Sequence, residues 1–185
     1  MLYAQLHLTL PPWIHDQVDA DFNYETAESR IALAVQLSQL NVSHQSGGPF
    51  GAAVFNQSGR LLGVGVNRVV PHNCSAAHAE VMALTTTQQR LQKFRLNDGG
   101  GRITLATSAQ PCSMCYGALI WAGIDELLIA ARADDVQTLA GFDEGPLPGD
   151  WKGELEKRGI EVKTDLMRDE ACAVLKKYGE TGLVY

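Results

Sequence analysis

The chain has 185 residues and a formal net charge of -6, with 45% hydrophobic and 19% charged residues. This length predicts a single domain, residues 1–185, that can bury a core of its own. An acidic chain lacks the basic face that nucleic-acid binding requires, and its basic clusters are as short as Lys176 with Lys177. We therefore expect no nucleic-acid partner.

The cysteines and the apolar segments indicate where the protein resides. No apolar run approaches the roughly 18 residues that span a bilayer. The N-terminal MLYAQLHLTLPPW lacks the basic region and the continuous apolar stretch of a signal peptide. Four cysteines in such a chain are typical of reduced thiols or metal ligands rather than of disulfides. These features predict a cytoplasmic protein without a membrane partner.

The first third of the chain predicts an extension, a helix and a β-hairpin. Residues 1–22 are the extension, in which Leu and Ala at alternate positions favour a short strand or an edge segment. From about 24 to 44, apolar residues recur on one helical face until SGGP breaks the chain. The segments 50–56 and 60–67, separated by QSG, form a predicted hairpin.

The rest of the chain alternates between helices and strands. Residues 140–150 (AGFDEGPLPGD) form a loop punctuated by Gly and Pro. The alternating order predicts a three-layer α/β/α sandwich around a mixed sheet. Helices are expected at about 75–95, 112–123, 134–141 and 168–179, and strands at 102–109, 126–132 and 160–166.

Two short segments, HAE at 78–80 and PCSMC at 111–115, predict a metal centre. Cys112 and Cys115 are three residues apart at the start of a helix, so both sulfurs lie on one side of its first turn. The helix N-terminus favours their thiolate forms, and His78 supplies a neutral third ligand. Two thiolates and one imidazole suit Zn²⁺, and the fourth position is left for a water whose proton Glu80 would take.

The combination is more specific than either segment alone. An H-x-E sequence followed by P-C-x-x-C is the signature of zinc-dependent base deaminases. The pattern carries one geometric condition, because residues two apart on a helix do not face the same way. His78 and Glu80 can share a site only at the end of their helix.

Other interpretations of the cysteines remain. A CxxC pair alone is also found in redox proteins. Cys74, four residues before His78, would complete a closed Cys3His structural site that has no place for water. Against this, a closed site leaves Glu80 without a role, and a buried thiol is the more common fate of Cys74 and of Cys172.

The chain resembles the cytidine-deaminase-like superfamily, and its bacterial guanine deaminases in particular, over about residues 25–145. The first four matching blocks also resemble tRNA adenosine deaminases, whereas the fifth block, together with Trp121, favours the guanine branch. The blocks are GGPFGAAV (47–54), GVGVNRV (63–69), HAEVMAL (78–84), PCSMCYGALIWAGI (111–124) and GFDEG (141–145).

The resemblance implies a five-stranded sheet, one Zn²⁺ per chain, a homodimer, and hydrolysis of guanine to xanthine and ammonia. It also implies that His78, Cys112 and Cys115 hold the zinc and that Glu80 moves protons. Asn67 would bond the purine edge, although an Asn here is also typical of a turn that ends a strand.

Aromatic residues are further candidates for substrate binding. Phe50 could wall the base, although a Phe beside a core strand is more often packing. Phe142 is a second candidate wall, and Trp121 a third aromatic candidate. Tyr185 ends an apolar GLVY tail, and the resemblance implies a C-terminal segment that closes over the site.

The acidic pair in the 140–150 loop, Asp143 and Glu144, could supply the proton that the departing amine needs. An amide anion cannot leave, so the departing amine needs a proton, either from Glu80 again or from a second carboxylate. Glu144 is the candidate that we favour for its reach, and Asp143 is its competitor. A carboxylate there would accept from the N1–H and 2-amino donors of guanine, which adenine and cytosine do not present.

Three alternatives to guanine deamination stay open. The same zinc chemistry would serve a tRNA adenosine or cytosine-type deaminase, although the acidic charge opposes tRNA binding. Aminotriazines that carry the same amino-lactam edge could also fit. A zinc-stabilised binding module without activity is the third alternative, and the intact Glu80 speaks against it.

Overall fold

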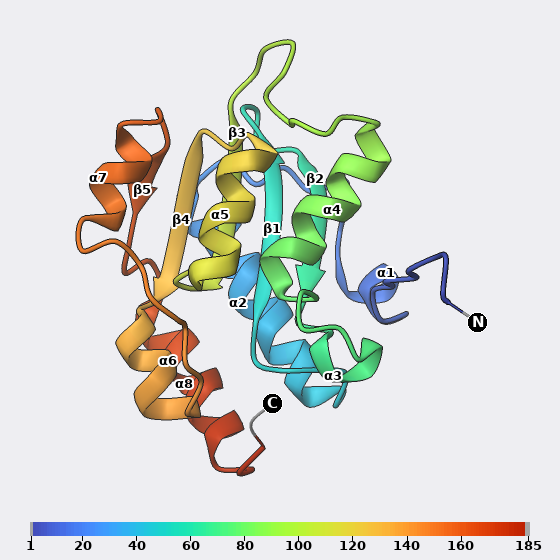
Figure 1. Ribbon diagram of the computed structural model, residues 1–185, viewed down its shortest axis with the longest axis vertical. Helices are drawn as coiled ribbons and strands as arrows, with labels where there is room; N and C mark the ends of the chain where they lie inside the picture. The colour runs from blue at the N-terminus through green and yellow to red at the C-terminus, as the bar shows by residue number, and fades with distance from the viewer. Residues whose placement is uncertain (1, 184–185) are drawn as a thin grey trace.

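The computed structural model describes residues 2–183, which are arranged around one mixed sheet in the strand order β2-β1-β3-β4-β5 (Figure 1). β1 is antiparallel to β2 and to β3, whereas β3, β4 and β5 run parallel. The predicted hairpin and the five-stranded mixed sheet are confirmed. The strands are β1 (Gly51–Asn56), β2 (Leu61–Val66), β3 (Ile103–Ala109), β4 (Glu126–Ala131) and β5 (Glu161–Lys163).

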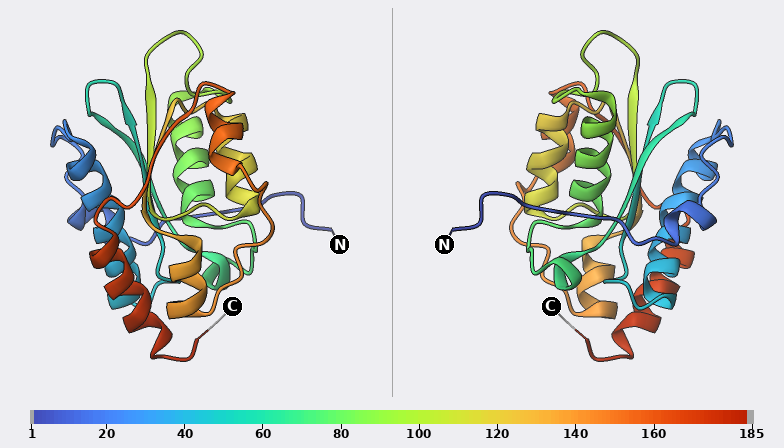
Figure 2. Two further views of the ribbon diagram at one scale, coloured as in Figure 1. Left: turned by 90° about the vertical axis from the view of Figure 1, so that its left-hand side faces the viewer. Right: turned by 90° about the vertical axis from the view of Figure 1, so that its right-hand side faces the viewer.

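Helices cover both faces of the sheet, which confirms the predicted three layers (Figure 2). α2 (Ala27–Ser43) and α8 (Arg168–Gly179) pack on one face. The other face carries α4 (Ala79–Leu91), α5 (Ser113–Ala122) and α7 (Trp151–Glu156). Because successive strand residues point to opposite faces, each strand contributes apolar side chains to both cores.

The remaining helices are short, and several were not expected from the sequence. α6 (Ala133–Ala140) confirms the helix predicted at 134–141, and it packs against α8. α1 (Ile14–Gln17), α3 (Val69–His72) and α7 had no clear periodicity. The helix expected at 75–95 is shorter, because the backbone of His78 is extended before α4 and that of Gln92 is left-handed after it. None of the described helices is long and apolar enough to cross a membrane.

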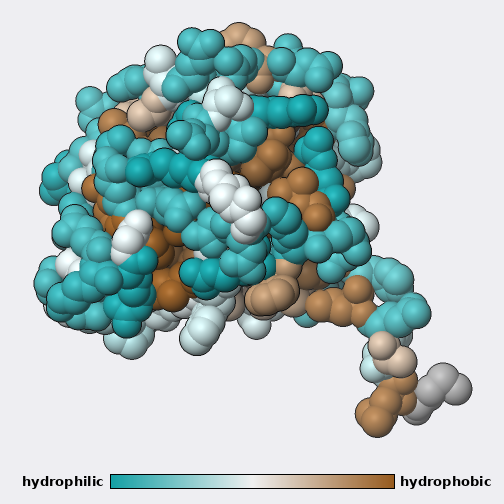
Figure 3. Space-filling view, turned by 90° about the horizontal axis from the view of Figure 1, so that it is seen from above, coloured by the Kyte–Doolittle hydropathy of each residue, from teal (hydrophilic) through white to brown (hydrophobic). Residues whose placement is uncertain are grey.

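The predicted edge strand at residues 2–10 is wrong. These residues pair with no strand, and the edges of the sheet are β2 and β5. Leu2, Tyr3 and Leu6 are 95%, 100% and 70% exposed, and the arm leaves the body of the molecule as an apolar projection (Figure 3). Alternation of apolar residues suits a strand, but it cannot provide a neighbouring strand with which to pair.

The sheet seats the N-terminal ends of α4 and α5 close together. Gly65 of β2 faces α4, and a Cβ at this position would lie 2.1 Å from the carbonyl oxygen of Ala79. The missing side chain therefore lets the first turn of α4 approach the sheet. The carboxyl end of β3 at Ala109 leads within three residues to Cys112, where α5 begins. Both helices thus begin at the same end of the sheet, which is the lower end of α4 and α5 in Figure 1.

A buried ion network stabilises the amino end of β4. The Glu126 carboxylate accepts from Thr104 Oγ1 at 2.7 Å and Lys163 Nζ at 2.8 Å. Arg30 and Arg102 each approach it to 3.5 Å. Burial raises the pKa of Glu126, but the hydrogen bonds from Lys163 and Thr104 and the nearby positive charges outweigh it, so the pKa lies below its ordinary 4.5.

We expect Glu126→Ala to lower the free energy of unfolding at pH 7 by about 3 kcal/mol, because it leaves the buried Arg30 without its carboxylate. Since the folded-state pKa of Glu126 is depressed, its contribution is present above 4.5 and is lost as the pH falls through that pKa. Urea unfolding at neutral and acidic pH measures both effects. Glu154→Ala, which removes exposed pairs with Lys157 and Arg158, is the control and should change little. If the difference in the free energy of unfolding between wild type and Glu126→Ala did not depend on pH, this account would be contradicted.

Candidate active site and metal centre

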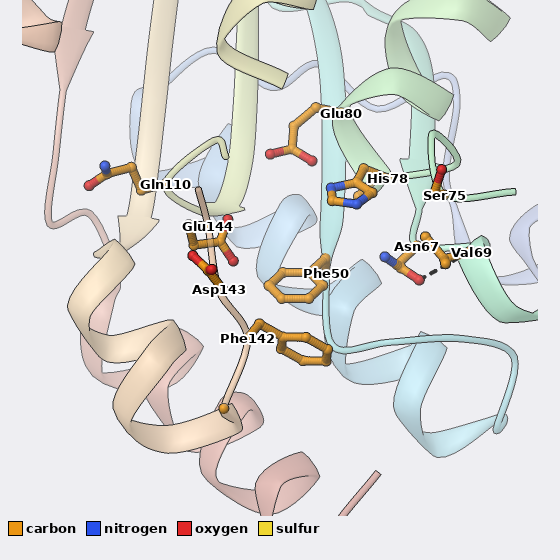
Figure 4. Close-up of a pocket in the computed structure, with 12 residues that line it drawn as sticks. Phe50, Asn67, Val69, Ser75, His78, Glu80, Gln110, Phe142, Asp143 and Glu144 are labelled. Carbon is orange, nitrogen blue, oxygen red and sulfur yellow. Dashed lines mark hydrogen bonds between the residues drawn. The ribbon is translucent and has the colours of Figure 1, made fainter. Parts of the chain in front are cut away.

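The start of α4 brings His78 and Glu80 to one cavity. His78 is the N-cap residue, with an extended backbone, and α4 begins at Ala79. Glu80 lies in the first turn and is buried. Because His78 stands outside the helical repeat, its ring and the Glu80 carboxylate can face the same space despite being two residues apart (Figure 4). The structure thus meets the geometric condition that the sequence imposed.

The start of α5 adds the two cysteines. Cys112 is the N-cap residue of α5 and Cys115 lies in its first turn, and both are buried. The ligand atoms of His78, Cys112 and Cys115 all lie within 4.8 Å of one another. Cys112 Sγ and His78 Nδ1 are 3.5 Å apart. Two sulfurs and one imidazole nitrogen this close together fit the donor set that zinc prefers.

Cys74 is not part of this cluster. It lies half-buried in the loop between α3 and α4, and the described residues that could share a metal ion are limited to the other three. A closed Cys3His site therefore has no support in the structure. The cavity beside the cluster stays accessible to a small molecule, as a catalytic metal site requires.

The two thiols have opposite proton affinities. A hydrogen bond from Cys115, assisted by His78, lowers the pKa of Cys112 to about 4. The hydrogen bond to Cys112, together with burial and the charge of Glu80, raises the pKa of Cys115. Because zinc binds thiolates, loading the site must release a proton.

The 141–145 loop is fixed against the start of α5. The backbone N–H of Ser113 donates to the carbonyl of Glu144 at 3.0 Å. Gly145 has a φ of +68° and lies so close that a Cβ would be 2.6 Å from Ser113 Oγ. Glycine is the residue that adopts this left-handed conformation without strain. The contact holds the loop beside the metal cluster.

The two acidic side chains of this loop have different surroundings. Asp143 is exposed, and its Oδ1 accepts from the backbone N–H of Gly145 at 2.9 Å. Glu144 is half-buried and lies on the opposite side of the cavity from Glu80 and His78 (Figure 4). Burial raises the pKa of Glu144 to about 8, with the charge of Glu80 as the next cause. Burial likewise raises the pKa of Glu80 to about 7. Two carboxylates thus share one weakly solvated cavity.

The cavity has a volume of about 410 Å³ and an aromatic wall. The rings of Phe50 and Phe142 meet edge to face at 5.3 Å, and Phe142 also stacks with Tyr178 at 5.9 Å. A volume of this order is typical of small-molecule sites, which combine apolar walls with a few polar groups. The wall is therefore suited to a flat, partly apolar ligand.

Asn67 follows β2 and presents its amide to the same cavity. Its Oδ1 accepts from the backbone N–H groups of Gly48 at 3.4 Å and Val69 at 3.3 Å. Because both donors contact Oδ1, the oxygen of the amide lies on the side away from the cavity. The amide nitrogen of Asn67 accordingly points toward the cavity in Figure 4. The site therefore offers a hydrogen-bond donor at this position.

One predicted substrate residue, Trp121, does not line this cavity. Trp121 is 78% exposed and lines a separate groove with Phe94. It is six residues after Cys115, at about 100° per residue, so it points away from the metal cluster. Tyr185 lies outside the described residues 2–183. Val69, Ser75 and Gln110 line the cavity without having been predicted. Of these three residues, only Gln110 had a position in the sequence that pointed to the site, because it stands between a predicted buried strand and Pro111 of the PCSMC segment.

Residues 24–131 match the family model of the cytidine and deoxycytidylate deaminase zinc-binding region. The chain belongs to this family. A deaminase domain of this kind binds zinc, and the cluster on α4 and α5 supplies the fitting donor set. Among its curated relatives, the Bacillus subtilis guanine deaminase is 38% identical over 66% of this chain and 72% of the relative. A tRNA-specific adenosine deaminase from Buchnera aphidicola is 32% identical over 70% and 79%.

Solved structures of deaminases are similar along almost the whole chain. The guanine deaminase from Nitrosomonas europaea is 46% identical, with a TM-score of 0.91, covering 97% of this chain and 99% of that one. A structure of a mutant of the protein NE0047 in complex with 8-azaguanine is also 46% identical, with a TM-score of 0.90 and coverage of 96% of this chain and 98% of that one.

We expect Cys112→Ser and Cys115→Ser to lose the zinc, because a hydroxyl is a much poorer ligand than a thiolate. Cys74→Ser should keep one zinc per chain. Elemental analysis of the purified proteins measures the ratio. Loss of metal from Cys74→Ser, or full zinc in both of the other variants, would refute this assignment of ligands.

Proposed function

We propose that this deaminase hydrolyses guanine to xanthine and ammonia. The observation that carries the proposal is the pair of carboxylates, Glu80 and Glu144, on opposite sides of one cavity next to the three metal-ligating side chains. The relatives that act on guanine and the similar structure that holds 8-azaguanine support this substrate.

Glu144 would recognise the amino-lactam edge of the base. Guanine presents the N1–H and the 2-amino group side by side, and a carboxylate can accept from both at once. Asn67 would donate through its amide nitrogen to an acceptor of the base, and Phe50 and Phe142 would contact its face. Asp143 takes no direct part in this proposal, because its carboxylate is turned back onto Gly145.

The reaction requires two proton transfers that these side chains can perform. His78, Cys112 and Cys115 would hold the zinc, which would supply Lewis-acid activation and lower the pKa of a water molecule to about 7. The Glu80 carboxylate takes a proton from the attacking water and delivers it to a ring nitrogen, which makes C2 more electrophilic. As the C2–O bond forms, the amino nitrogen needs a proton before the C2–N bond breaks. Glu144 can relay to it the remaining proton of the added hydroxyl, so that a carbonyl forms at C2 as ammonia leaves. Ammonia and the lactam product are then released.

Other amino-lactam heterocycles, such as aminotriazines, present the same edge and are secondary candidate substrates. An adenosine in tRNA is less well matched, because adenine lacks the two adjacent donors and the net charge of -6 opposes a polyanion. A purely structural zinc module would leave two buried carboxylates in the cavity without a function. We also expect a cytoplasmic location, which the four free thiols support.

We further propose that the protein is a homodimer that associates through α4 and α5. Residues 111–124 contain no charged side chain, and Met114, Ala118 and Trp121 recur at helical spacing on the outer side of α5. An apolar groove of about 480 Å³ lies between Trp121 and Phe94. The apolar N-terminal arm projects on the same side of the sheet as these helices (Figure 2). A second copy is an occupant that could cover both features.

Ammonia release from guanine, adenosine, cytosine, cytidine and aminotriazines tests the proposed function. We expect guanine to be deaminated, and Glu80→Ala to lower kcat/KM by about 10³-fold, since it removes a general base. Glu144→Ala should lower it by about 10²-fold, while Asp143→Ala should change it little. No release from any compound with the guanine edge would defeat the proposal. A larger loss in Asp143→Ala than in Glu144→Ala would exchange their roles.

The mass in solution tests the homodimer. We expect wild type to have twice the chain mass by light scattering, and Trp121→Asp to shift it toward the monomer by placing a charge in the apolar interface. Phe22→Asp, at an exposed aromatic residue elsewhere on the surface, is the matched control and should stay dimeric. A monomeric wild type would disprove the proposal.

A further inference from the structure

The segment 9–13, which we call the N-terminal strap, lies against the two loops that hold Asn67. It precedes residue 24, where the family match begins. The loops are residues 44–50 before β1 and residues 67–78 between β2 and α4. Both carry residues that line the cavity, among them Phe50, Asn67 and His78. The strap therefore contacts the site from outside, at a distance from the reacting groups.

Arg68 joins the strap to both loops. Its Nε donates to the carbonyl of Thr9 at 3.3 Å, and its Nη1 donates to the carbonyl of Ser46. The backbone N–H of Arg68 donates to the carbonyl of Ala77 at 2.8 Å. His72 Nε2 lies 2.8 Å from the carbonyl oxygen of Thr9, which anchors the strap a second time. One guanidinium thus ties three stretches of chain that are distant in sequence.

A second series of hydrogen bonds leads from the strap to Asn67. Trp13 Nε1 donates to Ser46 Oγ at 3.0 Å, and Ser46 Oγ donates to Asn41 Oδ1 at 2.7 Å. Asn41 is fully buried, and its Nδ2 donates to the carbonyl of Asn67 at 3.0 Å and to that of Gly48 at 2.8 Å. The backbone of Asn67 is therefore connected to the strap through Asn41 and Ser46.

The two loops approach each other closely at Gly47. A Cβ at Gly47 would lie 1.9 Å from the carbonyl oxygen of Asn67. The Asn67 Oδ1 contacts, at 3.4 and 3.3 Å, are longer than ordinary N–H···O hydrogen bonds. Because both donors are backbone groups of the two loops, the place of Oδ1 follows the positions of Gly48 and Val69. A small shift of either loop would turn the amide away from the ligand.

We propose that Arg68, anchored by the N-terminal strap, is a positioning residue that sets the place of the Asn67 amide against the bound base. The inference rests on the proposed function for its substrate. Arg68 does not line the cavity, and it acts through Asn67. Loss of a binding contact that is equal in the ground and transition states raises KM with little change in kcat.

A double-mutant cycle separates this role from a general contribution to folding. In the zinc-loaded full-length protein, we expect Arg68→Ala to raise KM for guanine by about tenfold, because misplacement by 1 Å costs up to about 10²-fold. Arg68→Ala added to Asn67→Ala should lower kcat/KM no further than Asn67→Ala alone, since coupled residues are not additive. Arg68→Lys, which keeps one donor, should recover part of the loss.

The chain offers a matched control in Arg90. Its Nη1 also donates to a backbone carbonyl, that of Leu62 at 2.9 Å, but on the outer side of α4. Arg90→Ala should leave KM unchanged. An Arg68→Ala that has no effect on KM, or one that lowers kcat/KM equally with and without Asn67, overturns the inference.

Two deletions test the strap itself. Deleting residues 2–9 removes the Thr9 carbonyl, so it should raise KM and add little to Arg68→Ala. Deleting residues 2–6 removes only the projecting arm, and it should leave KM unchanged. Equal effects of the two deletions would show that the Thr9 contact has no role.

Amide hydrogen exchange provides a readout that does not depend on guanine. We expect Arg68→Ala and the 2–9 deletion to speed exchange in residues 67–73 relative to Arg90→Ala. If wild type releases no ammonia from guanine, the proposed function fails while this measurement still decides whether the strap holds the loop. Unchanged exchange in residues 67–73 overturns the positioning role.

Discussion

The site depends on the compensation of negative charge in a small buried space. Two cysteines and two carboxylates surround one cavity, where little water is available to stabilise anions. The pKa values of Glu80 and Glu144 are both raised, and only one of the two thiols loses its proton readily. Helix N-termini supply part of the compensation, because α4 and α5 both begin at this cavity. A divalent cation supplies the rest, which explains why the donors are gathered so closely.

The fold produces this convergence by simple means. β2 lacks a side chain at Gly65, so α4 lies close to the sheet, and β3 leads almost directly into α5. The 141–145 loop then contacts α5 through Ser113. These backbone contacts bring together the segments that carry the polar groups. Such placement suits catalysis, since the geometry exists before the substrate arrives.

A second level of support lies outside the cavity. The N-terminal strap contacts the Asn67 loop through Arg68 and through the series that includes Asn41. The Glu126 network is at the opposite end of the sheet and stabilises the fold without approaching the cavity. The molecule thus separates residues that hold the sheet together from residues that hold the binding loops in position.

The sequence by itself determined the chemistry of the metal centre and the layer architecture. Both are local properties, because ligand types, helix starts and apolar periodicity are set by residues a few positions apart. Only the tertiary structure decided that Asp143 is turned back on its own loop, that the Asn67 amide nitrogen faces the cavity and that Trp121 faces away from it. It also showed that the N-terminal extension is a strap and a projecting arm rather than an edge strand. These features depend on contacts between segments as far apart as Thr9 and Arg68, which no local pattern encodes.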